Sequence, residues 1–308
     1  MKVNKPKFWD KQIGIFSILL LPFSLITIII IYIKKKLTDT QKFNIPIICV
    51  GNIYLGGTGK TPLSIMLANE LSDAGKKPVI LRKYYKSHKD EYNLIKKNFR
   101  NLIVNKKRAY GLVEAEKLHY DVAILDDGFQ DYTIRKDLSI ICFNGNQLTG
   151  NGLILPSGPL RENLSSLKQA DIVIINGIKN SYFEKKILKI NKDLNIFYSN
   201  YKPTNIDTFK NKKLCAIAGI GNPENFFKLI LENDLNVEKK IIFPDHYEIK
   251  KDEIQSILDQ AEKNDQQIIM TEKDFFKVKN YNLKKIDYLK IALEIDEKNK
   301  LLNILKNL

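Results

Sequence analysis

A glycine-rich stretch between two apolar segments constrains the fold of this chain more than any other feature. It reads Val50-Gly-Asn-Ile-Tyr-Leu-Gly-Gly-Thr-Gly-Lys-Thr-Pro62, after the apolar run 45–50 and before apolar residues spaced as one face of a helix. A strand, a glycine-rich turn, Lys-Thr and a helix are the context that a phosphate-binding loop requires. Backbone N–H groups can then approach phosphate oxygens, and the helix N-terminus favours negative charge. The residues expected to bind a nucleotide are Gly51, Asn52, Gly56, Gly57, Thr58, Gly59, Lys60 and Thr61.

One position departs from the usual form of such a loop. In the pattern G-x-x-x-x-G-K-[ST] the first glycine would stand at position 54, where this chain has Tyr54. Gly51, Gly56 and Gly57 would then have to supply the missing flexibility. The alternative is a glycine-rich loop that binds nothing, and the Lys-Thr pair with a helix directly behind it disfavours that interpretation.

Near the N-terminus, Ile13 to Ile33 form a segment of 21 residues without a charge. Such a segment is long enough to span a bilayer, although Pro22 interrupts it. No small-residue cleavage site precedes the basic stop at 34–36, so we expect an uncleaved membrane helix. A helix lying in one leaflet and a buried core helix are the alternatives. Both flanks are basic and give no orientation, but a loop that binds ATP places the remainder of the chain on the cytoplasmic side.

From residue 45 onward, apolar runs alternate with helical patterns, which predicts an α/β fold. Continuously apolar strands indicate a parallel sheet covered on both faces, as in P-loop NTPases. The strands of this sheet are expected at 45–50, 78–81, 102–104, 121–125, 138–143 and 172–175. A second, smaller α/β region begins near 205, with strands near 213–219, 239–243, 267–271 and 287–293. We therefore predict a membrane anchor at 1–37, a P-loop domain at 38–204 and a smaller C-terminal α/β domain at 205–308.

The net charge of +15 is concentrated in two places. Residues 1–36 carry seven Lys and one Asp, and residues 82–108 carry ten Lys or Arg against two acidic residues. Local charge predicts local partners: membrane lipids for the first cluster and phosphates for the second, rather than nucleic acid. The three cysteines lie in apolar runs without metal-ligand spacing, which predicts buried, reduced thiols and no structural zinc.

An acidic pair follows the predicted strand 121–125. Asp126-Asp127 stand where a Walker-B carboxylate holds Mg²⁺ in nucleotide-hydrolysing and kinase folds, and Thr61 can supply a further ligand. The alternative is a simple Asp-Asp-Gly turn at the end of a strand. Because the pair lies downstream of a phosphate-binding loop, we favour the metal site.

Six motifs in order give the chain a specific resemblance. It resembles the tetraacyldisaccharide 4′-kinase family, the lipid A kinases of Gram-negative bacteria, over residues from about 8 to 293. The motifs are 50–62, Asp126-Asp-Gly-Phe-Gln130, Leu155-Pro-Ser-Gly-Pro-Leu-Arg-Glu162, Gly219-Ile-Gly-Asn-Pro223, Phe243-Pro-Asp-His246 and Thr271-Glu-Lys-Asp274. The family's own loop begins with Gly-Asn, at Gly51-Asn52, which accounts for Tyr54.

The resemblance implies a lipid kinase. Its expected reaction transfers the γ-phosphate of ATP, with Mg²⁺, to the 4′-hydroxyl of a tetraacylated glucosamine disaccharide 1-phosphate. Its expected location is the bacterial inner membrane, with the catalytic domains on the cytoplasmic side and no stable protein partner.

The resemblance also implies site residues outside the loop. Asp90 and Glu91 align with the family's catalytic Asp-Glu pair, and His246 aligns with its catalytic His. Asp90 and His246 are thus expected in catalysis, and Glu91 beside Asp126 and Asp127 in metal binding. Basic candidates for phosphate contacts, for which solvated surface charge is the alternative role, are Arg82, Arg108 and Arg161.

The chain departs from the family's pattern at several positions. Two glycines of the family are replaced in Leu81-Arg-Lys-Tyr-Tyr85, and Asp131 stands where the family has His after Gln130. Two other classes of function remain open at this point: a membrane-bound P-loop GTPase or partitioning ATPase, and a non-catalytic membrane adaptor. The absence of an Asn-Lys-x-Asp sequence argues against GTP, and the intact Lys60 argues against an inactive adaptor.

Overall fold

The computed structural model describes residues 6–245 and 247–306, and these form two compact units, each with its own sheet and core. The large unit comprises the described residues within 3–84, 101–200 and 294–308, and the small unit comprises 85–100 and the described residues of 201–293. The units do not follow the linear division expected from the sequence. Residues 85–100 belong with the C-terminal region, and the last residues belong with the large unit.

An eight-stranded sheet forms the large unit, in the order β12-β7-β6-β5-β1-β4-β2-β3. Every pairing from β7 through β3 is parallel. The central strands are buried along their whole length, which explains their continuous apolar sequences. The strands are β1 (Ile47–Gly51), β2 (Pro78–Lys83), β3 (Leu102–Asn105), β4 (Val122–Asp126), β5 (Leu138–Asn144), β6 (Ile172–Asn176), β7 (Asn195–Pro203) and β12 (Ile291–Ile295).

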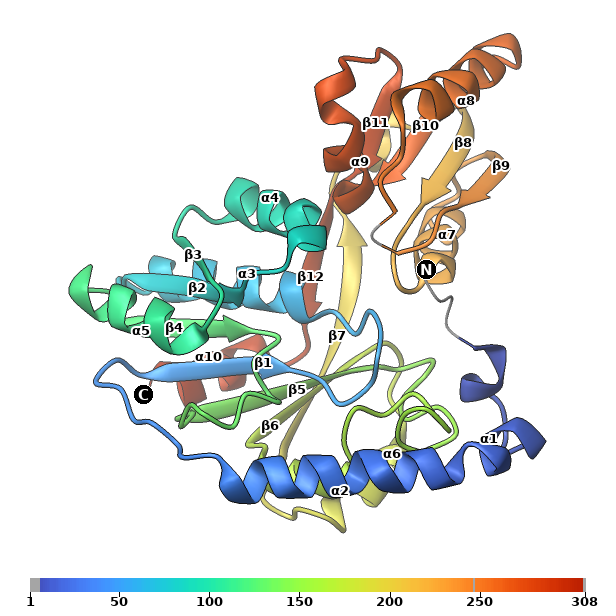
Figure 1. Cartoon of the computed structure of the whole chain (residues 1–308). Helices are drawn as coiled ribbons and strands as arrows, with labels where there is room; N and C mark the ends of the chain where they lie inside the picture. The colour runs from blue at the N-terminus through green and yellow to red at the C-terminus, as the bar shows by residue number, and fades with distance from the viewer. Residues whose placement is uncertain (1–5, 246, 307–308) are drawn as a thin grey trace. The chain divides into compact units, whose positions relative to one another are not determined.

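The register of this sheet brings functional residues to one edge. Asp126 at the end of β4 pairs with Val50 on β1 and with Arg82 on β2. The carboxyl ends of neighbouring parallel strands are where ligands bind in open α/β sheets. The helices of this unit beyond the N-terminal region are α3 (Lys60–Asp73), α5 (Arg108–Lys117), α6 (Ser181–Leu188) and α10 (Lys298–Lys306) (Figure 1).

The N-terminal region contains two helices, α1 (Ile15–Leu19) and α2 (Leu21–Leu37), separated at Leu20 (Figure 1). Pro22 stands in the first turn of α2 and has no N–H to continue the preceding helix, so it begins a new one. In the described part of the chain, no helix has both the length and the apolar character needed to cross a bilayer. The prediction of one continuous membrane-spanning helix over 13–33 was therefore wrong.

Polar and apolar faces are reversed in these two helices relative to an ordinary surface helix. Ser17 and Ser24 are buried, whereas most of the large apolar side chains of both helices are exposed. Ser24 Oγ donates to the Ile154 carbonyl at 2.8 Å and lies 2.8 Å from Ser157 Oγ. The small polar residues therefore attach the helices to the loop that contains residues 150–162, and the apolar residues point outward.

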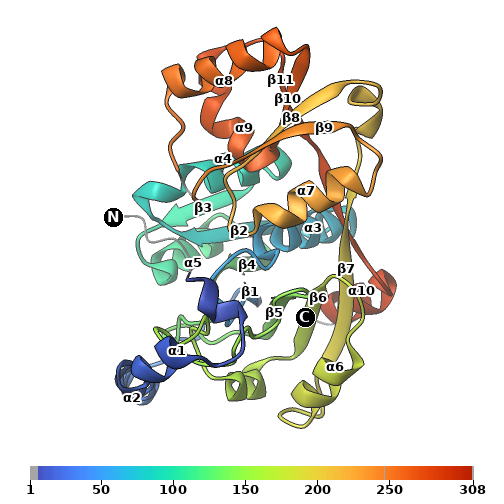
Figure 2. The ribbon, with the colours of Figure 1, turned by 90° about the vertical axis from the view of Figure 1, so that its right-hand side faces the viewer.

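A four-stranded parallel sheet forms the small unit, in the order β11-β10-β8-β9. Its strands are β8 (Lys213–Ala218), β9 (Val237–Ile242), β10 (Gln266–Thr271) and β11 (Ile286–Leu289). Its helices are α4 (Lys89–Asn98), α7 (Pro223–Leu231), α8 (Lys251–Lys263) and α9 (Glu272–Val278). One core packs α7 against the sheet, and a second core packs α8 and α9 against the other face. Figure 2 shows α7 and α8 on opposite sides of this sheet.

Several elements differ from the sequence-based expectation. The apolar run 287–293 was expected to be one strand, but Lys290 divides it between β11 and β12, which belong to different sheets. Helices α4, α6 and α9 and strand β7 were not foreseen. Short 3₁₀ helices complete the fold: η1 (Lys7–Asp10), η2 (Lys86–His88), η3 (Leu164–Gln169), η4 (Ile206–Thr208) and η5 (Lys279–Tyr281).

Candidate active site

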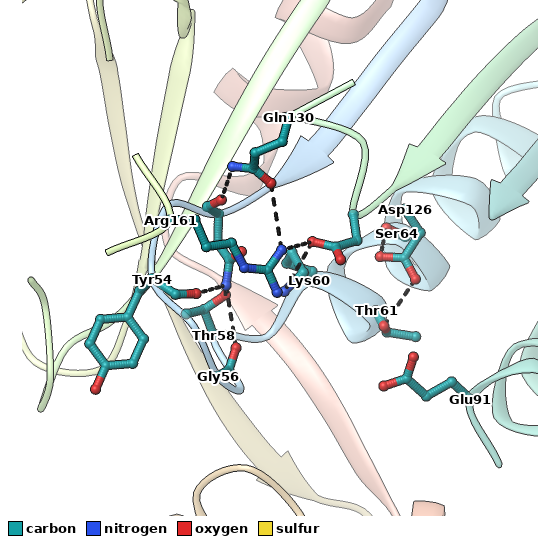
Figure 3. A network of polar contacts seen from close by, with 12 residues as sticks. Tyr54, Gly56, Thr58, Lys60, Thr61, Ser64, Glu91, Asp126, Gln130 and Arg161 are labelled. Atoms are coloured by element: carbon teal, nitrogen blue, oxygen red, sulfur yellow. Dashed lines mark hydrogen bonds and ion pairs between the residues drawn. The ribbon is translucent and has the colours of Figure 1, made fainter. Parts of the chain in front are cut away.

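The side chain of Asn52 holds the phosphate-binding loop in shape. Its buried Nδ2 donates to the Tyr54 carbonyl at 2.6 Å, the Gly56 carbonyl at 3.3 Å and Thr58 Oγ1 at 3.0 Å (Figure 3). The loop connects the end of β1 to Lys60, the first residue of α3. One amide thus preorganises the loop from inside, and the backbone needs left-handed conformations only at glycines, with φ of 147° at Gly56 and 90° at Gly59.

Tyr54 occupies the position of the missing glycine without entering the loop's concave side. Its ring is buried, and its hydroxyl donates to Asp10 Oδ1 at 2.6 Å. Burial, the hydrogen bond and the charge of Asp10 all raise the pKa of Tyr54. Its backbone forms a bridge with Leu160, so the irregular residue ties the loop to the N-terminal segment and to the 150–162 loop.

The Asp126–Gln130 segment packs directly against the phosphate-binding loop. A Cβ at Gly51 would lie 2.4 Å from Phe129 Cβ, which explains the glycine at this position. Gln130 Nε2 donates to the Asn52 carbonyl at 2.8 Å. The two motifs that carry the predicted phosphate and metal chemistry therefore form one packed structure.

Asp126 is completely buried and accepts from the loop helix. Its Oδ2 lies 3.0 Å from Thr61 Oγ1, and its Oδ1 lies 3.4 Å from Ser64 Oγ. Arg82 Nη1 forms a close ion pair with the same Oδ2 and donates to Thr61 Oγ1 at 3.0 Å. Arg82 is thus buried against the acidic strand end, whereas the sequence suggested only a contact with phosphate or with solvent.

Asp127 lies between two cations. Its Oδ1 is 3.5 Å from Lys60 Nζ and 2.9 Å from Arg161 Nη1 (Figure 3). Burial opposes ionisation of this carboxyl, but the nearby Lys60 and Arg161 outweigh it, so the pKa of Asp127 lies well below its usual value. Burial also lowers the pKa of Lys60, against the opposing effect of Asp127. Two cations share one carboxylate here, so the positive charge needed to bind an anion is already assembled.

The remaining arginine candidate supports the backbone of this site. Arg108 Nη2 donates to the Asp127 carbonyl at 2.5 Å, and its Nη1 lies 3.2 Å from Asp131 Oδ2. Asp127 has a left-handed φ of 58°, which is uncommon for a residue with a Cβ. Asp131, which stands where the family has His, therefore fixes the arginine that stabilises this turn.

The oxygen atoms near Lys60 suit a magnesium ion. Asp126, Asp127 and Thr61 offer hard oxygen donors, and Mg²⁺ characteristically takes one or two carboxylates and fills its other positions with phosphates and water. Within the described residues, no group of three or more His, Cys, Asp or Glu forms a protein-only metal cage. The donor set thus fits a metal ion that arrives with a nucleotide.

The small unit contains a second cluster of predicted site residues. Asp90 and Glu91 lie in the first turn of α4, and Lys273 Nζ on α9 is 3.5 Å from Asp90 Oδ2 and 3.3 Å from Glu91 Oε1. The same Nζ is 2.9 Å from Asp245 Oδ1. His246 lies outside the described residues, so its role in catalysis stays a prediction.

Ser64, Gln130 and Lys273 are among the residues of these clusters that sequence reasoning missed. Ser64 and Gln130 contact the acidic strand end and the loop, and Lys273 contacts the acidic pair. Gln130 and Lys273 both lie in motifs that the sequence analysis identified, but the sequence did not indicate what either side chain contacts. Ser64 could have been found from its spacing, one helical turn after Thr61.

Comparisons with known proteins find relatives that match nearly the whole chain. The family described as tetraacyldisaccharide-1-P 4′-kinase matches residues 16–308. A tetraacyldisaccharide 4′-kinase of Pelagibacter ubique is 43% identical, over 97% of this chain and 96% of its own length. One from Francisella tularensis subsp. novicida is 34% identical, over 94% and 99%. The crystal structure of the kinase LpxK from Aquifex aeolicus in complex with ATP has a TM-score of 0.75 and 26% identity, over 95% of this chain and 99% of that one.

Proposed function

Since this chain belongs to the tetraacyldisaccharide 4′-kinase family and is an ATP-dependent lipid kinase of lipid A biosynthesis, we propose how its residues divide the work. The loop at 51–61 binds the phosphates of ATP, with Lys60 on the outer phosphates. Lys60 is the first residue of α3, and both Lys60 and Arg161 lie close to Asp127, which supports this role. The alternative of a membrane NTPase with a non-lipid role is not favoured, because the family match covers nearly the whole chain.

The transfer itself needs a proton acceptor. The 4′-hydroxyl oxygen of the tetraacylated disaccharide 1-phosphate attacks the γ-phosphorus, the bond to the β,γ-bridging oxygen breaks, and ADP leaves. The hydroxyl proton passes to the Asp90 carboxylate, and His246 orients that carboxylate. The buried position of Asp90, at 7% exposure in the first turn of a helix, supports a preorganised base.

Magnesium would be held by Asp126, Asp127 and Thr61, and the predicted role of Glu91 in metal binding stays a prediction. When bound, Mg²⁺ neutralises the charge that the phosphates carry and develop during transfer. Arg82 orients the Asp126 carboxylate through the ion pair between them. Arg161 is the candidate for direct phosphate contact because its side chain is 25% exposed, more than those of Arg82 and Arg108.

The N-terminal helices support a place at the inner membrane. In α1 and α2 the outward side chains are apolar, with exposures such as 70% at Ile15, 58% at Phe23 and 59% at Ile30. A helix with an apolar outer face and a basic end, here at 34–36, lies in the interface of a bilayer and is attracted to anionic lipids. We propose that both helices lie in the cytoplasmic leaflet of the inner membrane, where the acyl chains of the substrate are also held.

One assay tests the proposal. Purified protein in mixed micelles is given labelled ATP, Mg²⁺ and the tetraacyl disaccharide 1-phosphate. The wild type transfers label to the lipid, and Lys60→Ala lowers the rate by about 10²- to 10³-fold, as loss of one charge-stabilising donor does elsewhere. Lys76→Ala, a surface control just after α3, retains full rate. Equal rates for wild type and Lys60→Ala would reject the loop as the ATP site.

A further inference from the structure

Lys273 joins three carboxylates of the small unit. Its Nζ lies 2.9 Å from Asp245 Oδ1, 3.3 Å from Glu91 Oε1 and 3.5 Å from Asp90 Oδ2. The carboxylates come from two separate parts of the chain, the first turn of α4 and the segment after β9. Lys273 itself lies in the first turn of α9, at 13% side-chain exposure. One ammonium group thus connects three segments that are distant in sequence.

The charges explain why a cation is needed at this point. Asp90 and Glu91 are adjacent, and a third carboxylate shares the same ammonium group. Carboxylates this close repel one another strongly when they are shielded from water, unless a cation lies among them. A side chain that satisfies this charge also fixes where each carboxylate points, because a Lys ammonium has three donors.

A neighbouring lysine provides a contrast. Lys277, one turn further along α9, is 2.6 Å from the buried Asp274 and 3.2 Å from the Gly219 carbonyl. Asp274 also accepts from the Gly219 N–H at 2.6 Å. That pair connects α9 to the end of β8 and has a structural role. Lys273, by contrast, is directed toward the carboxylates predicted to act on the substrate.

We propose that Lys273 is a positioning residue for the kinase reaction. It holds Asp90 and Glu91 in their working orientation and ties them to Asp245, the residue before His246. It does not touch the substrate and takes no proton. This inference rests on the proposed role of Asp90, and the experiment below separates the two.

The test compares three single variants of the full-length protein with the wild type. Lys273→Met removes the charge at nearly constant size, and Lys273→Arg retains it. Lys97→Met is the matched control, because Lys97 also links α4 to α9, through Glu272 at 3.3 Å, without contacting Asp90 or Glu91. Lys97 also contacts Tyr288 on β11. For each variant kcat, KM for both substrates, ATP affinity and Tm are measured.

We expect Lys273→Met to lower kcat by about 10- to 100-fold, as misplacement of a reacting group by about 1 Å does. ATP affinity should stay within twofold of the wild type, and Lys273→Arg should recover part of kcat. Lys97→Met should lower Tm but keep kcat. If Lys273→Met does not fold, the test uses Lys273→Arg instead. Arginine keeps the positive charge but places its nitrogen atoms differently, so the kcat of Lys273→Arg should fall several-fold.

A double variant determines whether the effect passes through Asp90. If Lys273 acts by positioning that carboxylate, Asp90→Asn/Lys273→Met should be no slower than Asp90→Asn alone. Wild-type kcat in Lys273→Met, or losses that multiply in the double variant, would overturn the inference. Full activity of Asp90→Asn would instead reject the proposed base, whatever the Lys273 variants do.

Discussion

Replacing Gly51 by Ala tests how the active site is assembled. The added Cβ would lie 2.4 Å from Phe129 Cβ, 3.2 Å from its backbone N and 3.4 Å from its Cα. Carbon atoms pack at about 3.5–4.0 Å, so an overlap of about 1 Å must be relieved. Phe129 cannot rotate away, since the clash involves Cβ and backbone rather than the ring. The segment that follows β4 must therefore move away from the phosphate-binding loop.

The movement has a cost in stability and in rate. Overpacking of a buried site of this kind costs about 1–3 kcal/mol of unfolding free energy. The shift would also stretch the 2.8 Å hydrogen bond from Gln130 to Asn52 and displace Asp127 from Lys60 and Arg161. A misplacement of about 1 Å lowers turnover by about 10²-fold.

Urea unfolding and the lipid kinase assay measure the two effects. Gly75→Ala is the control, because a Cβ there meets nothing within 4 Å and the cost is only the strain of a positive φ of 83°. That strain costs about 1 kcal/mol and should leave kcat unchanged. Wild-type stability and turnover in Gly51→Ala would refute the close packing of the two motifs.

Three further predictions concern charge, membrane contact and backbone support. The pKa of Asp127 is lower in the folded state than in the unfolded state, where it is about 3.9. Its ionised carboxyl therefore stabilises the fold above that pH, and this contribution is lost as the pH falls below it. The free energy of unfolding of Asp127→Asn in urea should thus depend less on pH than that of the wild type between about pH 5 and about pH 2. Ile26→Ser/Ile30→Ser should weaken sedimentation with anionic vesicles several-fold at unchanged Tm, because both side chains are exposed; unchanged sedimentation would contradict the proposed membrane face. Arg108→Lys cannot hold both Asp131 and the Asp127 carbonyl, so it should destabilise the protein by about 1–3 kcal/mol and lower kcat, and a silent variant would contradict that role.

Much of the large unit was predictable because its strands are buried on both faces. Continuous apolar runs mark such strands, and the motif order then places Lys60, Thr61 and Asp126 at one edge of the sheet. The partner of Asp126 was not predictable. Whether Arg82 meets phosphate, solvent or a carboxylate depends on the strand register, which the sequence does not display.

The small unit was harder to predict for a different reason. Helix α4 buries little more than Asp90, Tyr92 and Ile95, and its many charges hide the apolar spacing. Its membership of the C-terminal unit depends on contacts distant in sequence, such as those of Lys273. The prediction of one strand at 287–293 was wrong because this apolar run contributes strands to two different sheets. The local sequence pattern does not show where the chain passes from one sheet to the other.

The hydroxyl of Tyr54 has a consequence for attempts to shorten the protein. Asp10 accepts from it, Trp9 Nε1 donates to the Pro156 carbonyl at 3.0 Å, and Ser24 contacts Ser157. Deleting the first 37 residues to gain solubility would leave these buried polar groups without their partners beside the nucleotide loop. The N-terminal residues contribute both buried contacts and the exposed apolar surface. Exchanging exposed apolar side chains of α2 for polar ones would therefore raise solubility and keep the buried contacts.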